Sequence, residues 1–262
     1  MAGSPMATLS VIILTLNEAK NLSDCLAGVQ WADELIVVDS GSTDGTLEIA
    51  RTFTPNIFTI EWNGYGAARN FALEKAHGDW IFWLDADERV TPQLAGEIRS
   101  LLAAPPSGVT GYSIARRAYF LGRWIKHSGW YPARVVRLFR SGSGRFSETR
   151  VHEQLQVDGR VDHTKYDLLH FTDPDLFHYL HKFNRYTSLA AGDMEAAGRR
   201  FMLVDVVLRP AFQFVKMYIL RQGFRDGLEG FMLAVLSSAY VFTKYAKLWE
   251  RTRGPAHPAS RT

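Results

Sequence analysis

The chain has 262 residues and a mass of 29.6 kDa, enough for one large domain or for a domain with a helical extension. Hydrophobic residues make up 47% and charged residues 22%, which is ordinary globular composition and excludes a disordered or fibrous protein. The single cysteine, Cys25, excludes an internal disulfide framework and any Cys-x-x-Cys metal site or redox pair. The sequence has no secretory leader pattern and no apolar run of transmembrane length, so we expect a cytoplasmic protein, membrane-associated at most.

The net charge of +3 conceals an uneven distribution. Residues 1–115 carry 6 Lys and Arg against 14 Asp and Glu, residues 116–150 carry 9 against 1, and residues 151–262 carry 15 against 12. An acidic first half joined to a strongly basic segment indicates binding of metal ions, phosphates or an anionic surface.

The first third of the chain alternates strand-like and helix-like segments. Apolar runs, which are typical of strands buried on both faces, predict strands at residues 9–16 and 34–39, and residues 56–62 and 80–84 are also strand-like. Helix-like segments lie between them at residues 19–29, 45–53, 67–76 and 93–102. We expect Thr43 or Asp44 to cap the second helix and Thr91-Pro92 to open the fourth. This rhythm predicts an α/β fold, a mostly parallel sheet with helices on both faces.

The rhythm changes after a linker at residues 104–108. Residues 112–115 and 135–139 are strand-like and are separated by an aromatic and basic stretch. From residue 175 onward the pattern is helical and strongly aromatic. We therefore expect a helical, amphipathic region at residues 175–250 after the sheet, followed by a tail at residues 251–262.

Polar side chains stand at the ends of three predicted strands. They are Asn17-Glu18 after the first strand, Asp39 at the end of the second, and Asp85 and Asp87 after the fourth. Ligands of open parallel sheets bind at the carboxyl ends of the strands, and crowded carboxylates favour a hard divalent cation. A lone Asp-x-Asp is more often a solvated turn, but three acidic strand ends together favour a ligand crevice.

The segment Gly64-Tyr65-Gly66 suggests a dinucleotide-binding loop, but its third glycine is missing and it follows the third strand. We interpret Arg69 instead as an arginine near a helix start that reaches the crevice and contacts a base or phosphate. A plain surface arginine is the alternative.

The blocks LSVIILTLNEAKNLSDCLAGV, ELIVVDSGSTDGT, GYGAARNFAL and GDWIFWLDADE resemble the family-2 glycosyltransferases of the GT-A fold. The later blocks GWYPARVVRLFR, RVHEQL and RQGFRDGLEGF are similar to the bacterial lipopolysaccharide core heptose glucosyltransferases, and the resemblance runs from about residue 9 to 249. It implies a Rossmann-like GT-A sheet with a nucleotide-sugar half at residues 1–104 and an acceptor-binding, catalytic half at 105–174. The helical region would then associate with membrane.

The resemblance also implies ligands for a UDP-sugar in the crevice. The implied contacts are Thr15, Asn17 and Glu18 lining the nucleotide pocket, Asp39 on the uracil edge, Arg69 beside the base, Asp85 on the ribose and Asp87 on a divalent metal, Mg²⁺ or Mn²⁺. The chemistry agrees, because the leaving nucleoside diphosphate develops negative charge that needs a metal or cationic clamp.

Inverting transfer is a single displacement and needs one carboxylate as general base. We expect this base in the second half of the domain, where Glu153 is the first candidate and Glu148 the second. His152 would lie near the metal or diphosphate. The alternatives are an ion pair for Glu153 and a hydrogen-bonded structural role for His152.

The basic stretch offers further contacts. Arg134, Arg137 and Arg140 cannot all face one side of a strand, and we expect one or two, Arg137 among them, to clamp the diphosphate or a phosphorylated acceptor. Trp130 and Tyr131 offer flat surfaces for a sugar ring, with core packing as the alternative.

These features predict a metal-dependent inverting glycosyltransferase. We expect it to move glucose from a UDP-sugar onto a lipid-linked saccharide, the lipopolysaccharide inner core, with heptose as the acceptor sugar. The aromatic and cationic helices predict peripheral binding to an anionic membrane surface at the cytoplasmic face of the inner membrane, with packing on the catalytic domain as the alternative.

Three other functions are considered. The same chemistry on a capsule glycan or a polyprenyl phosphate is the nearest, and a non-catalytic nucleotide-binding scaffold is the second. A nucleic-acid binder is disfavoured, because the acidic crevice would repel a phosphate backbone.

Overall fold

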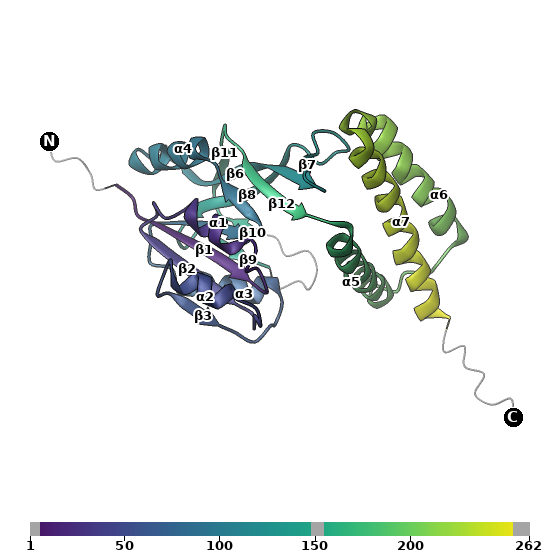
Figure 1. The fold of residues 1–262 in the computed structure, drawn as a ribbon, viewed down its shortest axis with the longest axis horizontal. Helices are drawn as coiled ribbons and strands as arrows, with labels where there is room; N and C mark the ends of the chain where they lie inside the picture. Colours follow the sequence, from purple (N-terminus) through teal and green to yellow (C-terminus); the bar gives the residue numbers. More distant parts are fainter. Residues whose placement is uncertain (1–5, 148–154, 254–262) are drawn as a thin grey trace, which may run out of the picture. The chain divides into compact units, whose positions relative to one another are not determined.

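The computed structural model describes residues 6–147 and 155–253, and the chain divides into two compact units (Figure 1). The first unit comprises residues 1–117 and 132–171, and the second comprises residues 118–131 and 172–262. Their described parts are taken one at a time below.

The first unit is built on a sheet whose first four strands are parallel, in the order β3-β2-β1-β4. These strands are β1 (Leu9–Thr15), β2 (Glu34–Asp39), β3 (Ile57–Thr59) and β4 (Trp80–Asp85). The aliphatic runs form buried strands because both faces of the sheet are covered: Val11 packs into one hydrophobic cluster and Ile12 into another. The α/β fold with a parallel sheet, predicted from these runs, is confirmed.

Four helices cover this sheet. They are α1 (Leu22–Ala27), α2 (Thr46–Arg51), α3 (Tyr65–Glu74) and α4 (Pro92–Ala103). Leu26 of α1 and Ile98 of α4 pack into the cluster that contains Val11, whereas Ala72 of α3 packs into the one that contains Ile12. The helices therefore lie on both faces of the sheet, as expected.

Helix starts follow local hydrogen bonding. The Thr91 hydroxyl accepts from Leu94 N at 3.2 Å and caps α4, with Pro92 in the first turn, as predicted. The predicted cap of α2 is wrong: Gly45 occupies the cap position, and the Asp44 carboxylate accepts from Thr46 N at 3.0 Å without capping the helix.

The second half of the sheet is largely antiparallel. Its strands are β5 (Glu88–Val90), β6 (Val109–Phe120), β7 (Arg123–Trp124), β8 (Ala133–Arg140), β11 (Arg160–His163) and β12 (Leu168–Asp173). Strand β8 runs antiparallel to β4, β6 antiparallel to β8, and β12 antiparallel to β5. Strands β9 (Gly144–Phe146) and β10 (Leu155–Val157) form a separate pair. The strands expected at residues 112–115 and 135–139 are thus the middles of longer strands.

The second unit contains the predicted C-terminal helices. These are α5 (Leu176–Ala196), α6 (Leu203–Phe214) with a π-helical continuation (Val215–Leu220), a 3-10 turn (Gly223–Asp226) and α7 (Gly227–Thr252). The hairpin at residues 118–131 joins them, because the buried Asp226 carboxylate accepts from the backbone N–H groups of Lys126 and His127 at 3.1 and 2.9 Å. No helix in the described ranges has the length and apolar character needed to cross a bilayer.

Candidate active site

The predicted crevice forms where the parallel strands end. In the sheet register Thr15 stands opposite Asp39, and Leu14 stands opposite Asp85. The polar groups that follow β1, β2 and β4 therefore gather at one edge, as expected for a ligand site in an open sheet.

Asp39 anchors the loop after β2. Its fully buried carboxylate accepts from Gly41 N at 2.9 Å, from Ser42 N at 2.8 Å and from the Thr15 hydroxyl at 3.1 Å. Asn17 ties the loop after β1 to the same loop: its N–H donates to Ser42 Oγ, and its Oδ1 accepts from Thr43 N, both at 2.8 Å. The residues predicted to line the nucleotide pocket are thus linked, whereas the uracil contact of Asp39 stays a prediction.

Glu18 completes this end of the site. Its backbone N–H donates to the Thr46 hydroxyl at 2.8 Å, at the start of α2. Its carboxylate accepts from the Asn21 side chain, also at 2.8 Å. The loops after β1 and β2 are therefore held together by hydrogen bonds at several points.

We expect Asp39→Asn to lower the free energy of unfolding by about 1–3 kcal/mol, because a neutral amide oxygen accepts more weakly than a carboxylate from the Gly41 and Ser42 N–H groups, and the amide –NH2 cannot accept from the Thr15 hydroxyl. Chemical denaturation measures the change. The matched control is Asp158→Asn, an exposed aspartate of the same unit, which should leave stability unchanged. Equal stability of the two variants would contradict an anchoring role. UDP affinity of Asp39→Asn tests the predicted uracil contact separately.

Asp85 lies between two arginines at the end of β4. Its Oδ1 accepts from Arg69 Nη2 and its Oδ2 from Arg137 Nη2, each at 2.9 Å. Burial alone would raise the pKa of Asp85, but the charges of Arg137 and Arg69 outweigh it and hold the pKa below its ordinary value. A carboxylate has about four acceptor positions, so the two ion pairs leave room for the predicted ribose hydroxyls.

Trp83 forms the floor beneath these arginines. The guanidinium carbons of Arg137 and Arg69 lie 3.5 and 4.2 Å from the centre of its ring. Arg69 itself is 5% exposed and belongs to α3, so the alternative of a plain surface arginine is wrong. The side chain reaches the crevice, as predicted, and its contact with a base stays a prediction.

Arg137 also meets Glu88, the first residue of β5. Both side chains are buried and form an ion pair of 2.5 Å, while Asp85 N donates to the second Glu88 oxygen at 3.0 Å. Burial raises the pKa of Glu88, although the charge of Arg137 opposes this. The burial of Glu88 rules out a solvated turn over the Asp-x-Asp segment.

The location of Arg137 corrects its predicted role. Its side chain is 1% exposed and touches Asp85, Glu88 and the Trp83 ring, so it is enclosed by the protein and does not face a substrate. We therefore describe Arg137 as a residue that positions the strand-end carboxylates, and not as a diphosphate clamp.

Asp87 presents a carboxylate of a different kind. It is 19% exposed, and its Oδ2 lies 3.3 Å from Nε2 of His170 in β12. Burial alone would lower the pKa of His170, but the hydrogen bond and charge of Asp87 outweigh it and raise the pKa. A histidine-bound carboxylate therefore lies two residues after Asp85 and next to Glu88, which are both bound by arginine.

The Asp87 carboxylate is a suitable ligand type for a hard divalent cation. Across residues 6–147 and 155–253 no three His, Cys, Asp or Glu side chains are grouped so as to enclose a metal ion. Mg²⁺ is usually held by one or two carboxylates together with substrate phosphates, so one accessible carboxylate is a suitable protein contribution. The predicted metal ligand at Asp87 stays a prediction.

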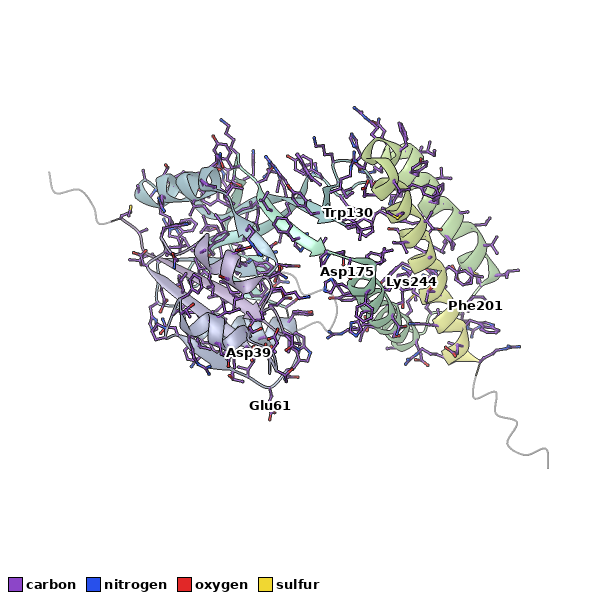
Figure 2. All side chains as sticks on the ribbon, viewed as in Figure 1. Asp39, Glu61, Trp130, Asp175, Phe201 and Lys244 are labelled. Atoms are coloured by element: carbon purple, nitrogen blue, oxygen red, sulfur yellow. The ribbon has the colours of Figure 1, made fainter. Side chains whose placement is uncertain are left out.

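Several predicted residues lie elsewhere. Glu148, His152 and Glu153 fall outside the described residues. Trp130, labelled in Figure 2, belongs to the second unit, where its ring packs against Phe120 at 6.3 Å between centroids. Its contact with a sugar stays a prediction.

Four side chains near the aspartates were not among the predicted site residues: Trp83, Glu88, Arg116 and His170. Burial is the largest influence on Arg116 and lowers its pKa, and Glu88, Asp85 and Asp87 are near enough to oppose this. Glu88 was visible as the acid after the Asp-x-Asp segment. His170 had no local signal, because only the pairing of β12 with β5 brings it to Asp87.

Comparison with known proteins agrees with this geometry. Residues 10–165 match the model of the family described as Glycosyl transferase family 2, which is more than half of the chain. The chain belongs to glycosyltransferase family 2. It is therefore a glycosyltransferase, as the strand-end motifs predicted.

Two relatives resemble this family-2 glycosyltransferase over most of their length. The lipopolysaccharide core biosynthesis glycosyltransferase LpsC of Rhizobium meliloti is 33% identical over 97% of this chain and 96% of its own. An uncharacterized glycosyltransferase of Rickettsia typhi, RT0209, is 27% identical over 94% of this chain and 88% of its own.

Among solved structures, glucosyl-3-phosphoglycerate synthase from Mycobacterium tuberculosis, in complex with Mg²⁺ and UDP, is 23% identical with a TM-score of 0.36. The match covers 44% of this chain and 44% of that one, so less than half of either protein is compared.

Proposed function

We propose that this family-2 glycosyltransferase moves glucose from a UDP-sugar to an inner-core sugar of lipopolysaccharide, heptose, by an inverting, metal-dependent reaction. The observation that carries the proposal is the pair of partly exposed carboxylates at the end of β4, where Asp85 is bound by two arginines and Asp87, two residues on, is bound by His170 instead of an arginine. The acceptor class is supported by the name of the relative LpsC, which is aligned over almost its whole length.

Different residues of the chain would contact different parts of the donor. Asp85, kept ionised by Arg69 and Arg137, offers acceptor positions to ribose hydroxyls. Thr15, Asn17 and Glu18 line the nucleotide end. Asp87, with His152 as the second proposed ligand, would hold Mg²⁺ or Mn²⁺, which when bound neutralises charge on the diphosphate.

Calorimetric titration of UDP into the purified protein tests the donor site. Tight binding that requires Mg²⁺ or Mn²⁺ is the expected result, because an acidic crevice without a cation repels the diphosphate. Absence of binding under both conditions would contradict the transferase proposal and favour a non-catalytic scaffold. Exchanging heptose-containing core, capsule glycan and polyprenyl phosphate in a transfer assay then identifies the acceptor.

We propose Glu153 as the general base that takes the proton from the acceptor hydroxyl. Glu153→Gln should lower kcat by about 100-fold or more, with donor affinity unchanged, because an amide cannot accept that proton. Single-turnover transfer and calorimetry measure the two quantities. Glu148→Gln is the control, and a larger loss there would move the assignment to Glu148. Weak donor binding by Glu153→Gln would instead indicate a structural ion pair.

We also propose that the protein binds peripherally to the anionic cytoplasmic face of the inner membrane. The outer side of α6 and its continuation is apolar and exposed, and it comprises Leu203, Val207, Leu208, Phe212, Ile219 and Leu220. Residues 199–228 contain six Arg and Lys and two acids, and both acids, Asp205 and Asp226, are buried. Every exposed charge in this segment is therefore positive, which favours anionic headgroups.

A further inference from the structure

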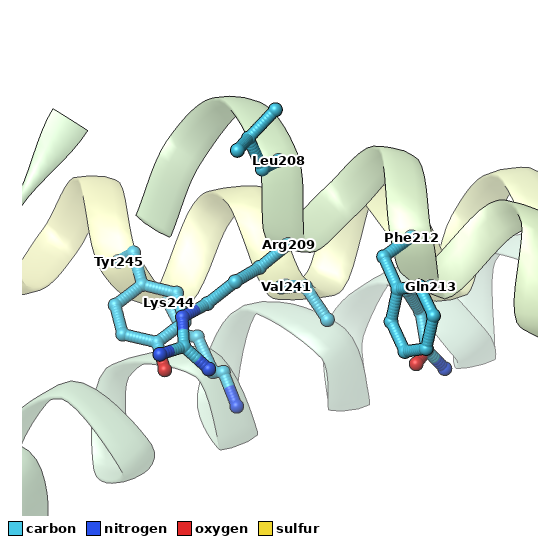
Figure 3. Close-up of a pocket in the computed structure, with 7 residues that line it drawn as sticks. All are labelled: Leu208, Arg209, Phe212, Gln213, Val241, Lys244 and Tyr245. Carbon is cyan, nitrogen blue, oxygen red and sulfur yellow. The ribbon is translucent and has the colours of Figure 1, made fainter. Parts of the chain in front are cut away.

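A pocket of about 300 Å³ opens between α6 and α7 of the second unit (Figure 3). Leu208 and Phe212 of α6 and Val241 of α7 supply apolar lining, while Arg209 and Lys244 supply cations beside the Tyr245 ring. Neither the donor site nor the proposed base makes use of this pocket.

Three cations converge on Tyr245. The charged ends of Arg199, Lys244 and Arg209 lie 5.0, 5.3 and 5.6 Å from the centre of its ring. Figure 3 shows the Arg209 guanidinium and the Lys244 ammonium on the same side of the pocket. Like charges this close repel one another unless an anion lies among them.

The protein supplies only part of the necessary negative charge. Asp205 accepts from Arg209 Nε at 2.5 Å and from Arg199 Nη2 at 3.3 Å, and it is fully buried beneath them. Lys244 forms neither an ion pair nor a hydrogen bond within the described part of the chain. Burial, followed by the charges of Arg199 and Arg209, lowers its pKa. Asp205 thus pairs with two of the three cations, and Lys244 has no carboxylate partner in the described part of the chain.

We propose that this pocket binds the phosphate of an anionic membrane lipid, with Lys244 as its principal contact. Ammonium and guanidinium groups form charge-assisted hydrogen bonds with phosphate oxygens. The apolar lining favours the phosphate of a lipid over free phosphate. Leu208 and Phe212 line the pocket and are also 61% and 60% exposed on the apolar side of α6, where an acyl chain can lie. The inference rests on the membrane association proposed above and specifies that the pocket binds the phosphate group of the lipid.

The test uses the full chain and a short-chain phosphatidic acid kept below its critical micelle concentration, titrated by calorimetry. Because a monomeric lipid presents no charged surface, diffuse attraction of the basic helices to a membrane does not contribute to the measured affinity. Lys244→Gln should weaken binding about tenfold, as expected for the loss of one charge-assisted hydrogen bond. Lys244→Arg should retain it. The matched control is Lys216→Gln, which removes an exposed lysine of the same region outside the pocket and should leave affinity unchanged.

Two outcomes overturn the proposal. Equal affinity for inorganic phosphate would show that free phosphate is the ligand, and equal effects of Lys244→Gln and Lys216→Gln would show diffuse attraction only. Sedimentation with phosphatidylcholine vesicles that contain phosphatidic acid distinguishes a failure of the proposed membrane association from a failure of the pocket assignment. If the wild type does not sediment with these vesicles, the membrane association itself fails. If it sediments while Lys244→Gln binds the monomeric lipid as tightly as Lys216→Gln does, only the pocket assignment fails.

Discussion

Replacing Arg137 by methionine is expected to lower the free energy of unfolding by about 3–5 kcal/mol, because it leaves the buried Glu88 carboxylate without its cation. Glu88 has no exposed surface, and Asp85 shares the same guanidinium nitrogen. Urea denaturation followed by circular dichroism measures the loss.

The control for Arg137→Met is Arg140→Met on the same strand. Arg140 is exposed and stacks on Trp80 at 5.2 Å, so its loss should cost about 1 kcal/mol or less. The double variant Arg137→Met/Glu88→Gln should recover part of the stability, since one uncompensated carboxylate is then neutral. If Arg137→Met proved as stable as Arg140→Met, the buried ion pair between Arg137 and Glu88 would not contribute to stability as described.

Under the proposed metal assignment, Asp87→Asn is expected to reduce kcat/KM for sugar transfer by about 1000-fold or more, because a divalent cation held by Asp87 would stabilise the departing diphosphate by several kcal/mol. The fold should persist, since the side chain is partly exposed and asparagine can still hydrogen-bond to His170. UDP release measures activity, and thermal melting verifies folding.

The matched control for Asp87→Asn is Asp24→Asn, which removes a carboxylate that is 79% exposed on α1. It should leave both activity and the metal dependence of UDP binding unchanged. Asp87→Asn should instead bind UDP equally weakly with and without Mn²⁺. Retained activity, or retained enhancement of UDP binding by Mn²⁺, would contradict the assignment of Asp87 to the metal.

The parallel half of the fold was predictable because its evidence is local. Runs such as residues 9–16 and 34–39 are apolar on both faces, and only a strand covered on both sides accommodates that pattern. Once the strands were parallel, the convergence of Asp39 and Asp85 followed from the direction of the chain. The gathering of these strand-end carboxylates at one edge of the sheet therefore followed from the sequence.

The remainder depends on contacts between distant segments. His170 reaches Asp87 only because β12 pairs with β5 in antiparallel register, and no local pattern specifies this. Strand alternation indicated that Arg134, Arg137 and Arg140 could not share one side, and the middle one is indeed buried while the other two are exposed. Alternation alone does not specify which side of the strand faces the carboxylates. Arg137 was therefore predicted as a substrate contact.

The two units cannot be separated by a single cut in the chain. The hairpin at residues 118–131 lies within the span that matches the family model, yet it belongs to the second unit. Its Phe120 and Ile125 are buried in a cluster with Met217 and Leu233, far along the sequence. A chain shortened to end at residue 171 would leave Phe120 and Ile125 uncovered, so the recognisable family-2 segment depends for its own packing on helices that lie beyond it.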